Sequence, residues 1–293
     1  MASHTSTLTV RGPWSLATSK RFWEGFTPSA LTENLDSRDD VLRTVFRVDT
    51  DWSVASVEVV QDGQTATLTV EGDGNLDDAS AQVARFLSLD VDATGWPAVG
   101  ERDEVIADAQ RRLPGLRPCG FHSPYEAAAW SVLSQRVRIT QAAKLRERLV
   151  LDHGDRGAFP APHRLREAEL DLPGRKGEYL RAVAEAALEG RLDGAALGKA
   201  EPVQAIHDLQ AIKGIGPFAA ELIVLRGANA PDALPRNERR LEAEIAEKYG
   251  TGRTLEHISQ SWRPFRTWAA VHLRALREER TREIGGPDMP GGH

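Results

Sequence analysis

The sequence predicts an α+β fold in which a small antiparallel sheet module at the N-terminus precedes an all-helical region. Segments rich in Val and Thr with alternating polarity, which is typical of strands, occur only in the first third of the chain. From residue 101 on, apolar residues recur at helical spacing and strand patterns nearly vanish. A chain of 293 residues, of which 41% are hydrophobic, has ample material for the core of one large or two ordinary domains.

The N-terminal region is expected to contain four strands and two helices. Asp62-Gly63 falls between the last two strands, and such a pair favours a two-residue hairpin. The segment 90–100 contains Gly and Pro and is the predicted linker, so we expect the first domain to cover 1–95. The expected strands are 7–10, 41–48, 56–60 and 65–70, and the expected helices are 13–26 and 75–90.

The second domain, expected at 96–282, should consist of helices. Ser123 is followed by Pro124 and by Glu126, which is the pattern of a capping box at a helix N-terminus. We expect the last residues, 283–293, to form a disordered tail. The expected helical segments are 122–154, 175–192, 201–212, 217–227, 238–250 and 262–280.

Composition and charge exclude several classes of protein. No apolar run approaches eighteen residues and no signal peptide is recognisable, so we expect a cytoplasmic protein without a membrane partner. Cys119 is the single cysteine and forms neither an internal disulfide nor a metal cluster. The net charge is -6, but residues 1–100 carry 7 Lys/Arg and 15 Asp/Glu, whereas 101–293 carry 30 and 28. Charges more than about 10 Å apart are screened, so local basic clusters remain able to bind DNA.

A Gly-x-Gly turn predicts a phosphate-binding site. Gly214 and Gly216 separate two apolar helical segments; the first permits a sharp bend, and the second leaves room for a phosphate. The N–H groups at the start of the following helix would face that phosphate. The small Ala220 allows the helices to cross closely, and Lys213 adds a positive charge. The alternative interpretation is a helix-ending glycine that happens to precede another glycine.

This pattern resembles the helix-hairpin-helix motif of DNA-repair proteins. Residues 115–145 and 261–276 bracket the motif and extend the resemblance. Together with 159–165 and 175–190, they look like the bacterial DNA-3-methyladenine glycosylase II family within the helix-hairpin-helix glycosylase superfamily. The acidic first third is similar to the N-terminal module of that family, which is like half of a TATA-binding protein. The resemblance covers about 10–280.

The resemblance implies a monofunctional, monomeric, nucleoid-associated glycosylase of base excision repair. Such an enzyme flips a damaged, alkylated base out of double-stranded DNA and hydrolyses its N-glycosidic bond without a cofactor. Relatives that also cut the strand carry a Lys at the position of Phe218, which cannot form an imine. Pro118 stands where relatives insert an apolar wedge into the DNA. The expected DNA-binding residues are Lys213, Gly214, Ile215, Gly216, Phe218, Ala219, Gln135, Arg136, Pro118 and Arg236.

The catalytic position departs from the family. Relatives have an essential Asp that stabilises the oxocarbenium-like charge of the sugar, and here Asn237 stands in its place, followed by Glu238. Three interpretations stay open: Glu238 replaces the Asp, the Asn is a substitution introduced to trap a complex, or the protein binds lesions without cutting them. Alternatively, both residues are structural, with Asn237 as the N-cap of the next helix.

The base pocket also differs from that of relatives, which stack aromatic rings on a cationic base. The aligned positions hold Phe218, Leu222 and Arg274, and Trp130 or Trp268 would have to replace the lost rings. Because an Arg repels a cationic base, specificity for 3-methyladenine is in question. The resemblance further implies a structural Na⁺ or K⁺ at the hairpin, held by the carbonyls of Gln210, Ile212 and Ile215.

Overall fold

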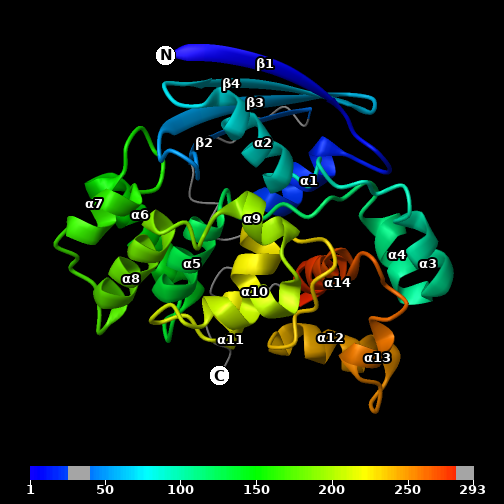
Figure 1. The fold of residues 1–293 in the computed structure, drawn as a ribbon. Coiled ribbons are helices and arrows are strands. Elements are labelled where there is room, and N and C mark those ends of the chain that lie inside the picture. Colours follow the sequence, from blue (N-terminus) through cyan, green and yellow to red (C-terminus); the bar gives the residue numbers. More distant parts are fainter. Residues whose placement is uncertain (26–39, 282–293) are drawn as a thin grey trace, which may run out of the picture.

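The computed structural model of the protein describes residues 1–25 and 40–281. A four-stranded antiparallel sheet lies at one end of the molecule, and helices form the rest (Figure 1). This arrangement confirms the predicted α+β class. The predicted tail 283–293 lies outside the described residues.

The sheet has the strand order β1-β4-β3-β2, and every neighbouring pair is antiparallel. The predicted hairpin joins β3 to β4, and Gly63 adopts a positive φ of 54° in its turn. Helices α1 (Leu16–Glu24) and α2 (Leu76–Phe86) lie on the side of the sheet that faces the helical region (Figure 1). The strands are β1 (Ala2–Thr9), β2 (Val41–Arg47), β3 (Val54–Asp62) and β4 (Thr65–Gly72).

The helical region contains all six predicted segments. The segment 122–154 divides into two helices at a loop in which Arg136 has a φ of 54°. The predicted segments correspond to α5 (Pro124–Leu133), α6 (Ile139–His153), α8 (Lys176–Leu188), α10 (Pro202–Leu209), α11 (Pro217–Leu222) with the π-helical turn η1 (Ile223–Gly227), α12 (Arg239–Tyr249) and α14 (Arg266–Thr281). Five short helices were not predicted: α3 (Pro97–Arg102), α4 (Glu104–Arg112), α7 (Pro162–Glu167), α9 (Gly194–Lys199) and α13 (Leu255–Ile258).

Two of the apolar cores lie among the helices that carry the predicted site residues. One surrounds α5, α8, α11 and η1, and it includes Trp130. The other lies where α3, α12 and α14 meet, with Trp96, Trp262 and Trp268 at its centre. The segment 90–100, predicted as the linker, is packed: its Ala93 and Trp96 are buried in the second core, and its end forms α3. Apolar burial turns this connection into a packed segment.

Buried polar side chains join the sheet module to the helices. Arg117 is fully buried, and its guanidinium donates to the carbonyls of Pro13 and Val91 among others. Asn229 has a φ of 58°, and the two hydrogens of its Nδ2 are shared among four acceptors within hydrogen-bond distance, of which the carbonyl of Pro118 is one, at 3.0 Å. Buried donors of this kind are stable because each finds an acceptor. The sheet module is thereby fixed against η1 and the loop before α5.

Candidate functional site

The two glycines of the predicted turn have different roles. Gly214 has a φ of 91°, and a Cβ added there would lie 2.4 Å from Cγ of Tyr179, so only glycine fits. Gly216 is exposed, and a Cβ there would meet nothing within 4 Å. The first intrahelical hydrogen bond of α11 runs from Ala220 N–H to Gly216 O, which leaves the N–H groups before it available to a ligand.

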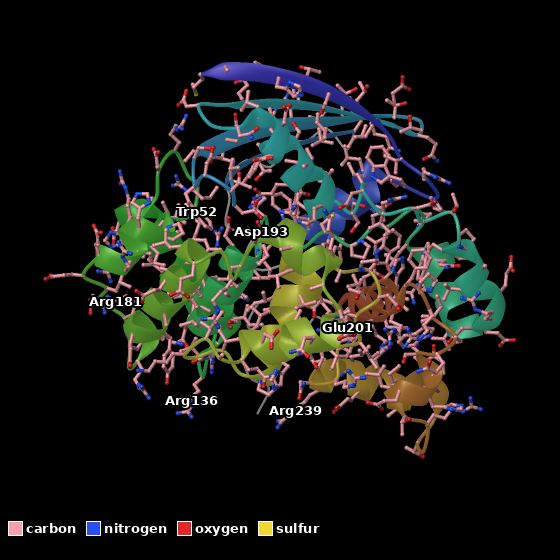
Figure 2. All side chains as sticks on the ribbon, in the orientation of Figure 1. Trp52, Arg136, Arg181, Asp193, Glu201 and Arg239 are labelled. Atoms are coloured by element: carbon pink, nitrogen blue, oxygen red, sulfur yellow. The ribbon has the colours of Figure 1, made fainter. Side chains whose placement is uncertain are left out.

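The hairpin is braced against the loop between α5 and α6. Gln135 Nε2 donates to the carbonyl of Gly214 at 2.8 Å, so this amide supports the turn. Lys176 is buried and donates to the carbonyls of Val132 at 2.9 Å and Gln135 at 2.7 Å. Burial lowers the pKa of Lys176. These hydrogen bonds join the hairpin, the loop between α5 and α6, and the start of α8. Arg136 projects from that loop (Figure 2).

The charged residues near the hairpin are partly paired. Lys213 forms an ion pair with Glu178 of α8, which also pairs with Arg175 at 2.7 Å. Arg236 is exposed and lies 3.8 Å from a carboxylate oxygen of Glu256. Lys213 and Arg236 are both solvent-accessible, and exposed ion pairs of this kind are weak enough to exchange for a phosphate.

Asn237 is held by the carboxylate of Glu221, which was not among the residues predicted for the site. Glu221 of α11 is 4% exposed, and its oxygens accept the side-chain Nδ2 of Asn237 at 2.7 Å and the backbone N–H groups of Asn237 and Arg236 at 2.9 and 3.1 Å. The prediction that Asn237 caps α12 is wrong, because Glu238 is the N-cap residue and makes no side-chain cap hydrogen bond. The amide of Asn237 is engaged with Glu221 instead.

Glu238 is paired with an arginine. Its carboxylate lies 3.1 Å from Nε of Arg274 on α14, and the Arg274 side chain is 13% exposed. Nη1 of Arg274 is buried and has no hydrogen-bond partner in the described part of the chain. Arg226 of η1 is also close: burial lowers its pKa to about 10, while the charge of Glu238 raises it. We call the group of Glu221, Arg226, Asn237, Glu238 and Arg274 the α11–α14 corner.

The predicted pocket residues differ in exposure. Phe218 is 50% exposed at the first turn of α11, and Leu222 is partly buried one turn later. Trp130 is 7% exposed and packs in the helical core, and Trp268 is 1% exposed in the second core. The two tryptophans thus serve packing, and stacking on a base is left to Phe218.

Pro118 does not occupy the position expected of a wedge. The residue is buried, and its carbonyl accepts hydrogen bonds from Ser88 Oγ at 2.7 Å and from Asn229. A ring fixed between the sheet module and η1 cannot enter a base step unless the loop leaves its site. Arg136, another predicted DNA-binding residue, is exposed and lies at the lower edge in Figure 2, as does Arg239.

Glu126 has a structural setting. Its N–H donates to Ser123 Oγ at 3.2 Å, which confirms Ser123 as the N-cap of α5. The carboxylate is buried and binds Arg146 at 3.1 Å and His122 at 3.7 Å. Burial alone would raise the pKa of Glu126, but the interactions with His122 and Arg146 lower it to about 2. This group stabilises the junction of α5 and α6.

Sequence reasoning missed Glu221, Arg226 and Lys176. For Glu221 and Arg226 the available signal was a charged residue within an otherwise apolar run, because such a residue is buried only with a partner. Lys176 lies among charged residues and gave no such signal. Among the described residues, no group of three His, Cys, Asp or Glu side chains is arranged to hold a metal. The predicted cation at the hairpin stays a prediction; it would share the carbonyl of Ile212 with the N–H of Ile215, 3.0 Å away.

Comparison with known proteins identifies relatives with related architecture. The chain is 30% identical over 187 residues to DNA-3-methyladenine glycosylase 2 of Escherichia coli, and 25% identical over 210 residues to DNA-3-methyladenine glycosylase of Bacillus subtilis. These alignments cover 58% and 65% of the chain, and they span only 65% and 69% of the relatives. No family model matches the chain.

Solved structures extend the likeness to nearly the whole fold. The 3-methyladenine DNA glycosylase of Archaeoglobus fulgidus superposes with a TM-score of 0.72 at 18% identity, covering 95% of this chain and 99% of that chain. The corresponding enzyme of Bacillus halodurans gives 0.55 at 25% identity, covering 66% of this chain and 93% of that chain. No helix in residues 1–25 and 40–281 is long and apolar enough to cross a membrane.

Proposed function

We propose that the chain is a member of the DNA-3-methyladenine glycosylase II family of the helix-hairpin-helix glycosylase superfamily, and that it excises a damaged base from double-stranded DNA in base excision repair. The observation that carries this proposal is the position of Asn237. Its hydrogen bonds to Glu221 hold it against α11, the helix that begins at the Gly-x-Gly turn. The proposed contact with the DNA backbone and the α11–α14 corner are therefore connected through α11.

The hairpin binds the DNA backbone in this proposal. The exposed turn at Gly216 offers N–H groups to a phosphate, and nothing on the protein occupies the space that a Cβ would fill. Such contacts position the protein without reading the sequence. Lys213, Arg136 and Arg236 supply positive charge around it, and all three are exposed.

The α11–α14 corner carries out the chemistry. Breakage of the N-glycosidic bond builds positive charge on the sugar, and a water attacks that carbon. Asn237 and Glu238 are the residues we assign to this site, with the dipole of the first and the carboxylate of the second stabilising the charge. Arg274 offsets part of the Glu238 charge at 3.1 Å, and a buried Arg disfavours a cationic base. We therefore propose that the substrate is a neutral damaged base.

Phe218 excludes a strand-cutting mechanism that uses an amine at this position, because a phenyl ring forms no imine. The protein then leaves the backbone intact. We further propose that it acts as a cytoplasmic monomer at the nucleoid, with the domain boundary at residues 95/96 and a structural Na⁺ or K⁺ at the carbonyls of Gln210, Ile212 and Ile215.

Base release from lesion-containing duplexes tests the function. We expect the wild-type protein to release free base and to leave abasic sites that break only after alkali treatment. Glu238→Gln should lower the rate at least about tenfold, whereas Glu242→Gln, an exposed carboxylate on the same helix, should not. Full activity of Glu238→Gln would reject the role of Glu238.

A lesion-binding protein without catalysis is the second candidate. The observation that favours it is Asn237, which carries no charge at the position where the family resemblance implies a catalytic Asp. Tight, salt-sensitive binding of a lesion duplex with no base release from cationic or neutral lesions would establish this alternative.

A further inference from the structure

The buried carboxylate of Glu221 is the least expected group of the α11–α14 corner. It belongs to an apolar helix and is 4% exposed, yet three N–H donors from Arg236 and Asn237 converge on its two oxygens. Such an arrangement suits the ionised carboxylate, which only accepts hydrogen bonds. A charge is stable at a buried position where hydrogen bonds replace its lost hydration.

The hydrogen bond from Asn237 Nδ2 fixes the orientation of the amide. Because the NH₂ group faces Glu221 at 2.7 Å, Oδ1 is left as an acceptor on a residue that is exposed to solvent. A charge-assisted hydrogen bond polarises the group that donates it, so part of the Glu221 charge is felt at Oδ1.

The two carboxylates of the corner have different partners. Glu238 faces the guanidinium of Arg274 at 3.1 Å, and Arg226 adds a second positive charge nearby. Glu221 is instead compensated by neutral N–H groups from the chain before α12. Its negative charge is therefore the less fully cancelled of the two.

We propose that Glu221 is a positioning residue that acts through Asn237, and that the pair presents to the flipped nucleotide the negative charge that a single carboxylate would supply. The proposal rests on the proposed function, because that function places the sugar beside Asn237. In the competing interpretation, Glu221 only ties α11 to the start of α12 and has no effect on charge at the sugar.

Two abasic-site analogues distinguish these interpretations. One duplex contains a cationic pyrrolidine, which imitates the charged sugar, and the other contains a neutral tetrahydrofuran. We expect the wild-type protein to bind the pyrrolidine duplex about tenfold more tightly. Glu221→Gln keeps the shape but removes the charge, and it should reduce this preference to about one. Glu242→Gln is the matched control and should keep it.

Two further variants make the test independent of folding defects. The double variant Glu221→Gln/Asn237→Asp exchanges the two groups, so that the amide donor is on α11 and the carboxylate is at position 237. It should restore the preference for the pyrrolidine duplex. Asn237→Leu removes the connecting amide at an exposed position and should abolish the preference even if Glu221→Gln does not fold. If Glu221 is only a structural tie, these variants lower the free energy of unfolding and leave the preference unchanged.

The outcomes separate this inference from the proposed function. A wild-type protein that releases no base but keeps the preference retains the inference and loses the enzymatic function. Base release together with a preference of about one, or a preference that Asn237→Leu leaves intact, would overturn the inference alone.

Discussion

Replacing Gly216 by Ala should weaken DNA binding without weakening the fold. The backbone at Gly216 is extended, with φ of -97° and ψ of -177°, and a Cβ there would contact nothing in the protein. An Ala at this N-cap position therefore changes the free energy of unfolding by only about 0.5 kcal/mol. The methyl group would nevertheless occupy the space that we assign to a phosphate.

The expected loss of affinity follows from the hydrogen bonds that the methyl group would prevent. A hydrogen bond to a charged group contributes about 1.5–3 kcal/mol. Loss of one such contact weakens binding about 10-fold to 150-fold. Anisotropy titrations of a labelled tetrahydrofuran duplex at fixed salt would measure this change, and urea unfolding would measure stability.

Gly214→Ala is the matched comparison. Its φ of 91° and the ring of Tyr179, 2.4 Å from an added Cβ, leave no space on the protein side. We expect it to destabilise the fold by about 1–3 kcal/mol. If Gly216→Ala binds DNA like the wild type, no phosphate contacts this turn and the reasoning fails.

Three further predictions concern binding, pH and packing. Arg136→Ala should weaken duplex binding regardless of sequence and reduce the salt dependence by about one phosphate contact, whereas the control Arg181→Ala should not; salt titrations would check this. Burial lowers the pKa of His272 to about 4, below its unfolded value of 6.5, so stability present above pH 6.5 is lost as the pH falls towards 4. Between pH 7 and 5, urea unfolding should show about 2 kcal/mol more loss for the wild type than for His272→Gln. Asn229→Ala should cost about 2 kcal/mol, measured as a lower Tm, because the two N–H donors of a buried amide are lost to the acceptors around them; an unchanged Tm would contradict this.

Local patterns in the sequence predicted most of the architecture. Alternating Val and Thr gave the strands, and Asp62-Gly63 gave the hairpin, since both signals depend only on neighbouring residues. Ser123 likewise predicted the start of α5. The short helix α13 escaped prediction because its four residues are too few for a helical pattern.

The site was less predictable because long-range contacts decide it. Glu221 and Asn237 are sixteen positions apart, and their hydrogen bond is invisible in the sequence. The same is true of Glu238 and Arg274, which meet only because α12 and α14 pack together. Pro118 was assigned to the DNA by resemblance, although the docking of the sheet module buries it.

The structure of the protein bound to a duplex with a tetrahydrofuran site tests the central claim most directly. We predict a phosphate within hydrogen-bond distance of the N–H groups of Phe218 and Ala219, with the everted sugar beside Asn237. A complex in which the DNA contacts another face, or in which the α11–α14 corner stays remote from the sugar, would contradict it.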